Sequence, residues 1–173
     1  LMLINNNAGI KPVKVDQEVI KVLKLAKEVS EETLIDGKAV YDVTISPVWK
    51  VWDFPNKIYS KFLDIRYDAP RQADIKDLLP LVDYSKIEIN EEESTVFLPV
   101  KGMGIDLGSI VKGYAADKMR EILVKHGITK AVINIGRNIL LLGSSYDKNK
   151  DYQDKPFDIK IVTPYVSEFD SDE

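Results

Sequence analysis

The chain has 173 residues, of which 45% are hydrophobic and 30% are charged, a composition typical of a globular protein and not of a fibrous or disordered one. The formal net charge of −4, with lysines spread along the chain, argues against a nucleic-acid-binding surface. The absence of cysteine excludes disulfides, zinc–thiolate sites and a cysteine nucleophile, and no apolar run is long enough to predict a membrane-spanning helix.

The first predicted elements are a loop, a helix and a strand. Residues 4–9 are polar and turn-rich, which predicts a loop. Asp16 is a suitable N-cap, and the apolar residues after it recur at helical spacing, so we expect an amphipathic helix over about residues 17–32. Residues 39–45 alternate in polarity and are rich in β-branched side chains, which predicts a strand.

The middle of the chain predicts short helices and a hairpin. Residues 46–52 are apolar after a Ser-Pro step and predict a short helix that contains both tryptophans. Residues 53–70 show little pattern, whereas the apolar spacing over residues 75–82 predicts a second short helix. The segments 87–89 and 95–98 flank an acidic turn, as the two strands of an antiparallel hairpin do.

The next segment predicts a strand, a helix and a strand. Residues 103–105 are expected to form the first strand, residues 109–126 the helix and residues 131–135 the second strand, with Gly127 closing the helix. The apolar residues of the helix lie on one face, so we expect that face to cover a sheet.

The C-terminal part predicts two more strands, at residues 139–142 and 157–162. We expect a single domain over residues 1–167 and a mobile acidic tail over residues 168–173. Because the chain opens on a leucine, we also expect that residues upstream of it have been removed.

The segment from Gly104 to Ala116 carries the main functional signal. It joins a predicted strand that ends on Asp106 to a helix through a glycine turn, and a helix N-terminus offers unpaired N–H groups to an anionic ligand. Its glycine spacing does not fit the dinucleotide-binding Gly-x-Gly-x-x-Gly pattern, and no Lys-Ser or Lys-Thr pair follows its last glycine as in a Walker A loop. The segment therefore indicates a nucleotide-like cofactor held by a different motif.

Three ordered stretches resemble the ApbE family of FAD:protein FMN transferases. DLGSIVKGYAAD, which begins at Asp106, resembles the family's Asp-Leu-Gly-Gly-Ile-Ala-Lys-Gly-Tyr-Ala-x-Asp signature. DGKAVYDVTISPV, which begins at Asp36, resembles Asp-Gly-(Ala)-Phe-Asp-x-Thr-x-x-Pro-Leu, and NIGRN, which begins at Asn134, resembles Asn-x-Gly-Gly-Asn/Asp. Weaker agreement runs from Asn5 to about Pro164, which is nearly the whole chain.

The resemblance implies an α+β fold, related to the T-fold, in which helices cover a mixed or largely antiparallel sheet. It implies an enzyme that uses Mg²⁺ to cleave FAD, links FMN to a Thr or Ser hydroxyl of a target flavoprotein and releases AMP. Two alternatives stay open: an FAD pyrophosphatase that yields free FMN and AMP, and a truncated flavin-binding paralogue without turnover. Because the family's targets belong to membrane redox complexes, the resemblance also implies an extracytoplasmic, lipid-anchored protein.

The resemblance also assigns site residues, position by position. Flavin-nucleotide contacts are implied for Val40, Tyr41, Asp42, Asp106 and Lys112. Ser109 would offer an oxygen to Mg²⁺, an ion that prefers oxygen ligands and substrate phosphates. No residue is assigned as the catalytic base.

The sequence departs from the family pattern in three ways. Arg137 replaces a glycine of the third motif and places a bulky cation where a close backbone approach is expected, and Ser109 replaces the common second glycine of the signature. The family also continues for roughly as many residues again past Pro164, into a part that supplies a His contact to the flavin and an Asp and a Thr to the metal. We therefore expect an incomplete domain.

Each assigned residue is also compatible with a structural role. Asp106 and Ser109 could be an ordinary N-cap pair for the helix that follows, and Asp42 could cap a turn or pair with a lysine. The third motif could do no more than build a tight turn, and His126, the only histidine, lies near a helix C-terminus where a surface role is expected.

Overall fold

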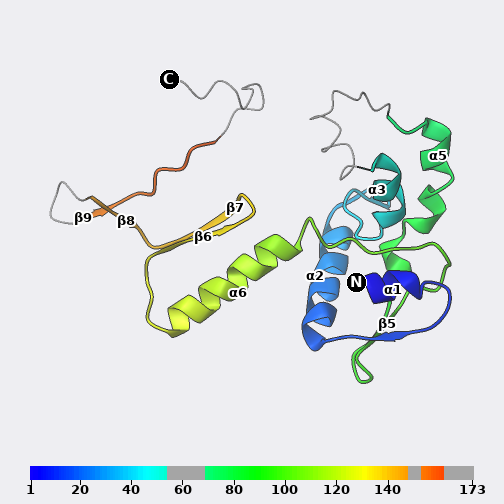
Figure 1. Cartoon of the computed structure of the whole chain (residues 1–173), viewed down its shortest axis with the longest axis horizontal. Helices are drawn as coiled ribbons and strands as arrows, with labels where there is room; N and C mark the ends of the chain where they lie inside the picture. Colours follow the sequence, from blue (N-terminus) through cyan, green and yellow to red (C-terminus); the bar gives the residue numbers. More distant parts are fainter. Residues whose placement is uncertain (54–68, 148–152, 162–173) are drawn as a thin grey trace. The chain divides into compact units, whose positions relative to one another are not determined.

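The computed structural model describes residues 1–53, 69–147 and 153–161 (Figure 1). The chain divides into two compact units, Leu1–Val111 and Lys112–Glu173, and we describe each by itself. The predicted single domain stays a prediction, and the predicted acidic tail and most of the patternless stretch 53–70 lie outside the described residues. Within the described ranges, no helix has both the length and the apolar character needed to cross a membrane.

The first unit begins with helices around a small sheet. Its helical segments are α1 (Met2–Asn6), α2 (Gln17–Glu32), α3 (Ser46–Trp52) and α5 (Gln72–Lys76), with short 3₁₀ turns η1 (Leu79–Leu81) and η2 (Tyr84–Lys86). Helix α2 has the predicted bounds, and the Asp16 carboxylate caps it by accepting a hydrogen bond from the Glu18 N–H at 2.8 Å. The loop predicted over residues 4–9 is wrong for residues 4–6, which belong to helix α1 with Ile4 buried, whereas residues 7–9 form turns as predicted.

The sheet of the first unit is antiparallel and has the strand order β1-β5-β4. The strands are β1 (Val13–Lys14), β4 (Glu88–Asn90) and β5 (Thr95–Phe97), and the β4–β5 pair is the predicted hairpin. Val96 lies opposite both Val13 and Ile89 and is fully buried. Val96 therefore belongs to the buried core of the first unit, to which α2 contributes Ile20 and Leu23.

A second hairpin contains the start of the motif that begins at Asp36. Strands β2 (Leu34–Ile35) and β3 (Lys38–Ala39) are joined by Asp36 and Gly37, whose φ angles are +50° and +72°. Two positive φ angles in a two-residue connection are what a type I′ hairpin requires, and Asp-Gly is a preferred pair for it. The predicted strand over residues 39–45 is wrong beyond Ala39, because the chain turns at Asp42 instead of continuing to pair.

In the second unit, the described residues form a helix followed by two hairpins. They are α6 (Val111–Lys125), the pair β6 (Ala131–Ile135) and β7 (Asn138–Leu142), and the pair β8 (Ser145–Asp147) and β9 (Gln153–Lys155). Gly127, with φ at +77°, ends the helix as predicted, and the Ile128 N–H closes the last turn on the Leu123 carbonyl at 3.0 Å. The strand predicted over residues 157–162 is wrong for its described part, residues 157–161.

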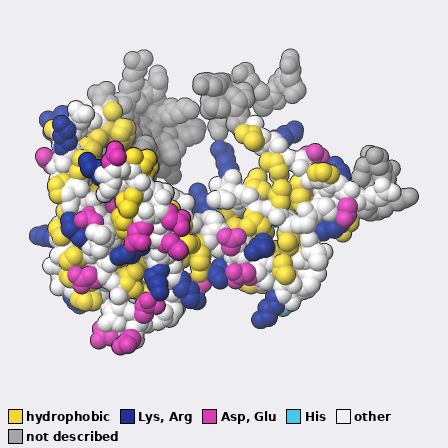
Figure 2. All heavy atoms as spheres, turned by 180° about the vertical axis from the view of Figure 1, so that it is seen from behind, with side chains coloured by type: hydrophobic (Ala, Val, Ile, Leu, Met, Phe, Trp, Pro, Cys, Tyr) yellow, Lys and Arg dark blue, Asp and Glu magenta, His cyan; other side chains and the backbone are white. Residues whose placement is uncertain are grey.

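The two units differ in how much apolar surface they bury. Among the described residues of the second unit, Ala116 and Ile133 are the only buried hydrophobic side chains. Met119 and Ile122 of α6 are 46% and 58% exposed, so the predicted burial of this helix face against a sheet is wrong. Figure 2 shows hydrophobic side chains among the surface atoms of the molecule. Helices mixed with small antiparallel sheets nevertheless give the predicted α+β class.

Candidate functional site

The Asp106 turn, residues 106–110, leads from a buried segment into helix α6. Ile105 and Leu107 are buried on either side of Asp106, and the Asp106 N–H donates to the Val43 carbonyl at 2.8 Å. The Asp106 Oδ1 accepts a hydrogen bond from the Gly108 N–H at 2.7 Å, which closes the turn on its own side chain. The Asp106 turn and the segment next to Asp42 are therefore adjacent, as expected for residues that the resemblance assigns to one flavin site.

Tyr41 and Ser109 form a second link between the same two motifs. The Ser109 hydroxyl donates to the Tyr41 hydroxyl at 3.2 Å, although the two residues are 68 positions apart. The Tyr41 N–H is held by the Thr33 hydroxyl at 3.3 Å, whereas the Val40 side chain is 69% exposed. The link places a carboxylate and two hydroxyls from distant parts of the sequence in one region of the first unit.

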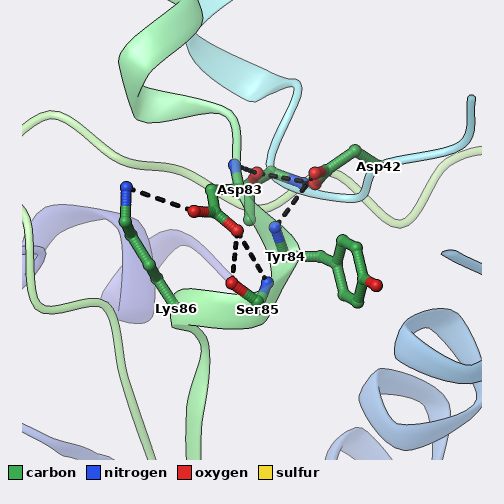
Figure 3. A network of polar contacts seen from close by, with 6 residues as sticks. Asp42, Asp83, Tyr84, Ser85 and Lys86 are labelled. Carbon is green, nitrogen blue, oxygen red and sulfur yellow. Dashed lines mark hydrogen bonds and ion pairs between the residues drawn. The ribbon is translucent and has the colours of Figure 1, made fainter. Parts of the chain in front are cut away.

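Both oxygens of the Asp42 carboxylate accept hydrogen bonds from neighbouring residues (Figure 3). Its Oδ1 accepts hydrogen bonds from the Thr44 N–H at 2.8 Å and the Thr44 hydroxyl at 2.6 Å, and its Oδ2 accepts one from the Tyr84 N–H at 2.9 Å. The Thr44 hydroxyl in turn accepts from the Asp83 N–H at 2.7 Å. This Asp42 network fixes η2 against the chain around Asp42, which is the structural role left open by the sequence. Its predicted flavin contact stays a prediction.

Hydrogen bonds, desolvation and charges next to the Asp42 network shift the pKa values of Asp83 and Tyr84. Hydrogen bonds from Ser85, and then the Lys86 ammonium 3.2 Å away, hold the pKa of Asp83 below its ordinary value. Desolvation, and then the nearby carboxylates of Glu31, Asp42 and Asp83, raise the pKa of Tyr84. Tyr84 therefore keeps its proton at neutral pH, and Asp83 carries a charge that Lys86 balances (Figure 3).

Asn5, on helix α1, contacts the residue just before the Asp106 turn, from a segment that the sequence did not connect with it. Its Nδ2 donates to the Ile105 carbonyl at 2.9 Å, and its Oδ1 accepts from the Ile105 N–H at 2.8 Å. These two hydrogen bonds, the Asn5 clamp, replace the strand pairing predicted for residues 103–105. No local pattern indicates them, because the two residues are 100 positions apart.

Lys112 and the third motif belong to the second unit. A side chain at Gly136 would begin 3.7 Å from the Lys112 ammonium, so that the ammonium lies over the turn between β6 and β7. Gly136 and Arg137 form this two-residue turn with φ angles of +55° and +71°, and the Arg137 N–H donates to the Asn134 side chain at 3.0 Å. The motif thus builds a tight turn, and its predicted ligand contacts stay a prediction.

The donor atoms of the Asp106 turn suit Mg²⁺ in part. Mg²⁺ binds oxygen ligands and is commonly held by one or two carboxylates together with substrate phosphates and water. Ser109 and Asp106 offer a hydroxyl and a carboxylate within one turn, and among the described residues no donor bonds the second oxygen of Asp106. No group of three or more His, Asp or Glu side chains able to hold a metal occurs in the described part of the chain. The turn therefore supplies oxygen ligands but not a complete protein cage.

Comparison with known proteins shows which protein family the sequence matches. A family model described as the ApbE family matches residues 1–172. The FAD:protein FMN transferase of Klebsiella pneumoniae (strain 342) is 34% identical over 143 residues, which cover 83% of this chain and 42% of that protein. The FAD:protein FMN transferase of Treponema pallidum (strain Nichols) is 29% identical over 151 residues, covering 84% of this chain and 38% of that protein. The chain thus spans less than half the length of these relatives.

Solved structures give the same grouping. A mutant of the flavin transferase ApbE from Vibrio cholerae superposes with a TM-score of 0.70 at 25% identity, covering 95% of this chain and 50% of that one. The ApbE protein of Thermotoga maritima superposes with a TM-score of 0.66 at 25% identity, covering 83% of this chain and 43% of that one. These likenesses confirm the predicted fold.

Proposed function

Because the chain belongs to the ApbE family, we propose that it transfers FMN from FAD to a Thr or Ser hydroxyl of a target flavoprotein, with Mg²⁺, and releases AMP. One observation carries this proposal: the two motifs that resemble the family's flavin site meet, through the hydrogen bonds of Asp106 to Val43 and of Ser109 to Tyr41. The names of the relatives support flavin transfer to a protein. As the chain spans less than half of them, we propose the activity for a protein that contains this chain.

The proposed reaction exchanges one phosphorus–oxygen bond for another. The acceptor hydroxyl oxygen bonds to the phosphorus on the FMN side of the FAD pyrophosphate, and the anhydride bond to the AMP phosphate breaks. AMP leaves with the electrons of that bond, and the proton of the acceptor hydroxyl is released to the solvent. Mg²⁺, when bound, would offset the negative charge of the pyrophosphate.

The residues of the first unit have separate roles in this proposal. The Asp106 oxygen that the Gly108 N–H does not occupy is available to accept hydrogen bonds from hydroxyl or amino groups of the nucleotide. Ser109 offers its oxygen lone pairs to the metal while its proton is donated to Tyr41. Tyr41 and Val40 contact the flavin nucleotide beside them, and the Asp42 network holds the segment in place.

Lys112 completes the proposed set of nucleotide contacts. It lies six positions after Asp106 in the sequence, in the first turn of α6, and its ammonium can offset phosphate charge. Its pairing with the phosphates is part of the proposal.

We further propose that the acceptor is a subunit of a membrane redox complex and that the full protein is extracytoplasmic and lipid-anchored. These two statements rest on the family resemblance alone. Fractionation of cells that express the full-length protein would test them, because a protein recovered only in the cytoplasm would contradict the proposed location.

The reaction can be followed by three products measured together. The protein is incubated with FAD, Mg²⁺ and an acceptor flavoprotein domain that carries a candidate Thr, and AMP, free FMN and the intact mass of the acceptor are recorded. The proposal predicts AMP together with an FMN-sized mass gain that is lost when the acceptor Thr is replaced by Val. AMP with equimolar free FMN would identify an FAD pyrophosphatase instead, and FAD binding without product would identify a flavin-binding protein without turnover.

Two pairs of variants connect the products with the Asp106 turn. Asp106→Asn keeps an oxygen for the Gly108 N–H but removes the charge, so that its comparison with Asp106→Ala separates charge from loop geometry. Ser109→Ala removes the proposed metal oxygen and Ser109→Thr keeps it, so only Ser109→Ala is expected to raise the Mg²⁺ concentration needed for half-maximal product. Equal Mg²⁺ dependence of both Ser109 variants would contradict the metal role.

A further inference from the structure

We propose that Asn5 is a positioning residue that fixes the direction of the Asp106 carboxylate, an inference that rests on the proposed function. The side-chain amide of Asn5 donates to and accepts from the same residue, Ile105, with both distances below 3.0 Å. A carboxamide is suited to this pairing, because it presents one acceptor and one donor side by side and so copies the edge of a β-strand. Helix α1 thereby does at Ile105 what a neighbouring strand would otherwise do.

The Asn5 clamp acts directly on the residue before Asp106. Ile105 is buried, and the next peptide N–H, that of Asp106, is bound to the Val43 carbonyl at 2.8 Å. The Asp106 side chain is then tied to the Gly108 N–H at 2.7 Å. The backbone of Ile105 and Asp106 and the Asp106 side chain are thus held by hydrogen bonds with Asn5, Val43 and Gly108.

Close packing leaves little freedom around the Asn5 clamp. Gly104 precedes Ile105, and a β-carbon added to it would lie 3.2 Å from the Ser46 hydroxyl and 3.6 Å from the Asn5 carboxamide carbon. Ser46 is buried at the start of α3, and Ile4 anchors α1 in the core next to Asn5. Because α1 and α3 enclose this backbone, loss of the clamp leaves the polar groups of Ile105 buried and unpaired and allows the Asp106 turn to shift.

The clamp is tested by a double-mutant cycle on FAD affinity, measured from flavin fluorescence in the presence of Mg²⁺. Asn5→Ala is expected to weaken FAD binding by about tenfold or more, because ligand contacts depend on the direction in which Asp106 is held. If Asn5 acts through Asp106, then Asn5→Ala causes little further loss in the Asp106→Ala background. Losses that multiply in the double variant would overturn the positioning role.

Two control variants separate this role from general stability. Asn7→Ala removes a carboxamide of the same segment that, among the described residues, bonds to the Leu3 carbonyl alone, and its FAD affinity is expected to equal that of the unaltered chain. Val96→Ala removes buried methyl groups in the sheet, and it is expected to lower Tm without changing FAD affinity. If Val96→Ala lowers FAD affinity as much as Asn5→Ala does, the effect of Asn5 comes from general stability, and the inference is overturned. Asn5→Asp, which keeps the acceptor for the Ile105 N–H, replaces Asn5→Ala in the cycle if the latter does not fold.

Hydrogen exchange tests the Asn5 clamp without any ligand. Amides in residues 103–108 are expected to exchange faster in Asn5→Ala than in Asn7→Ala, and equal exchange would overturn the inference. Failure of the unaltered protein to bind FAD would instead overturn the proposed function, while the exchange result still decides whether Asn5 holds the Asp106 turn. The two failures are therefore distinguishable.

Discussion

The hydroxyl of Thr44 joins two segments that lie far apart in the sequence. It is fully buried, donates to Asp42 at 2.6 Å and accepts from the Asp83 N–H at 2.7 Å. Thr44→Val preserves the shape but leaves a partly buried N–H without its acceptor, so we expect a loss of about 1–3 kcal/mol in the free energy of unfolding. Urea unfolding would measure this loss. Thr95→Val in β5 is the control, and equal effects of the two variants would contradict the importance of the Thr44 hydrogen bonds.

Because the pKa of Asp83 is lowered in the folded protein, we expect the stability of the fold to depend on pH. Hydrogen bonds from Ser85 and the charge of Lys86 lower the pKa of Asp83 in the folded state below the value of about 3.9 expected for the unfolded chain. The ionised carboxylate therefore stabilises the fold above the unfolded pKa, and this contribution is lost as the pH falls through the folded pKa. The Tm difference between the unaltered chain and Asp83→Asn should thus be present at pH 7 and shrink below about pH 4. A difference that is constant with pH would contradict this account.

At the scale of single elements, local patterns predicted the structure wherever neighbouring residues determine it. Helix α2, hairpin β4–β5 and hairpin β6–β7 form where expected, because their apolar spacing, capping and turn residues agree. The expected strands over residues 39–45 and 103–105 fail for a common reason. In each segment a polar side chain bonds to the backbone in place of a neighbouring strand. In residues 39–45 this is the local Asp42, and in residues 103–105 it is the distant Asn5.

The same distinction applies to the candidate site. The contact between the Asp106 turn and the segment next to Asp42 could be predicted, because two recognisable motifs carry it. The Asn5 clamp and the link between Thr44 and Asp83 could not, because their partners are separated by 100 and 39 positions without any sequence pattern.

The β6–β7 hairpin carries a residue in a strained conformation. Arg137 has a φ angle of +71°, a region that costs a non-glycine residue free energy. Arg137→Gly should therefore stabilise the hairpin by about 0.5–1 kcal/mol, the relief of strain being partly offset by the greater entropy of glycine in the unfolded chain. Thermal unfolding would measure the change. Arg120→Gly in helix α6 is the matched control and should destabilise by about 1 kcal/mol, and a loss of stability in Arg137→Gly would contradict the strain.

At the scale of the whole molecule, the two units should differ in stability. The first unit holds nearly all the buried hydrophobic side chains of the described residues, whereas the second holds only Ala116 and Ile133. Because apolar burial is the main source of stability, amides of α6 and β6–β7 are expected to exchange with solvent faster than those of α2. Hydrogen exchange resolved by mass spectrometry measures this directly. Equal protection in both units would contradict the prediction.

We propose that the Asp106 turn and the segment around Tyr41 form a flavin-nucleotide site. A crystal structure of the protein with FAD and Mg²⁺ would show where the nucleotide binds. We expect it beside Asp106, Ser109 and Tyr41, with Asn5 still paired to Ile105. FAD bound elsewhere, for example in the groove between α2 and β4 that Lys24, Lys27 and Ile87 line, would contradict it.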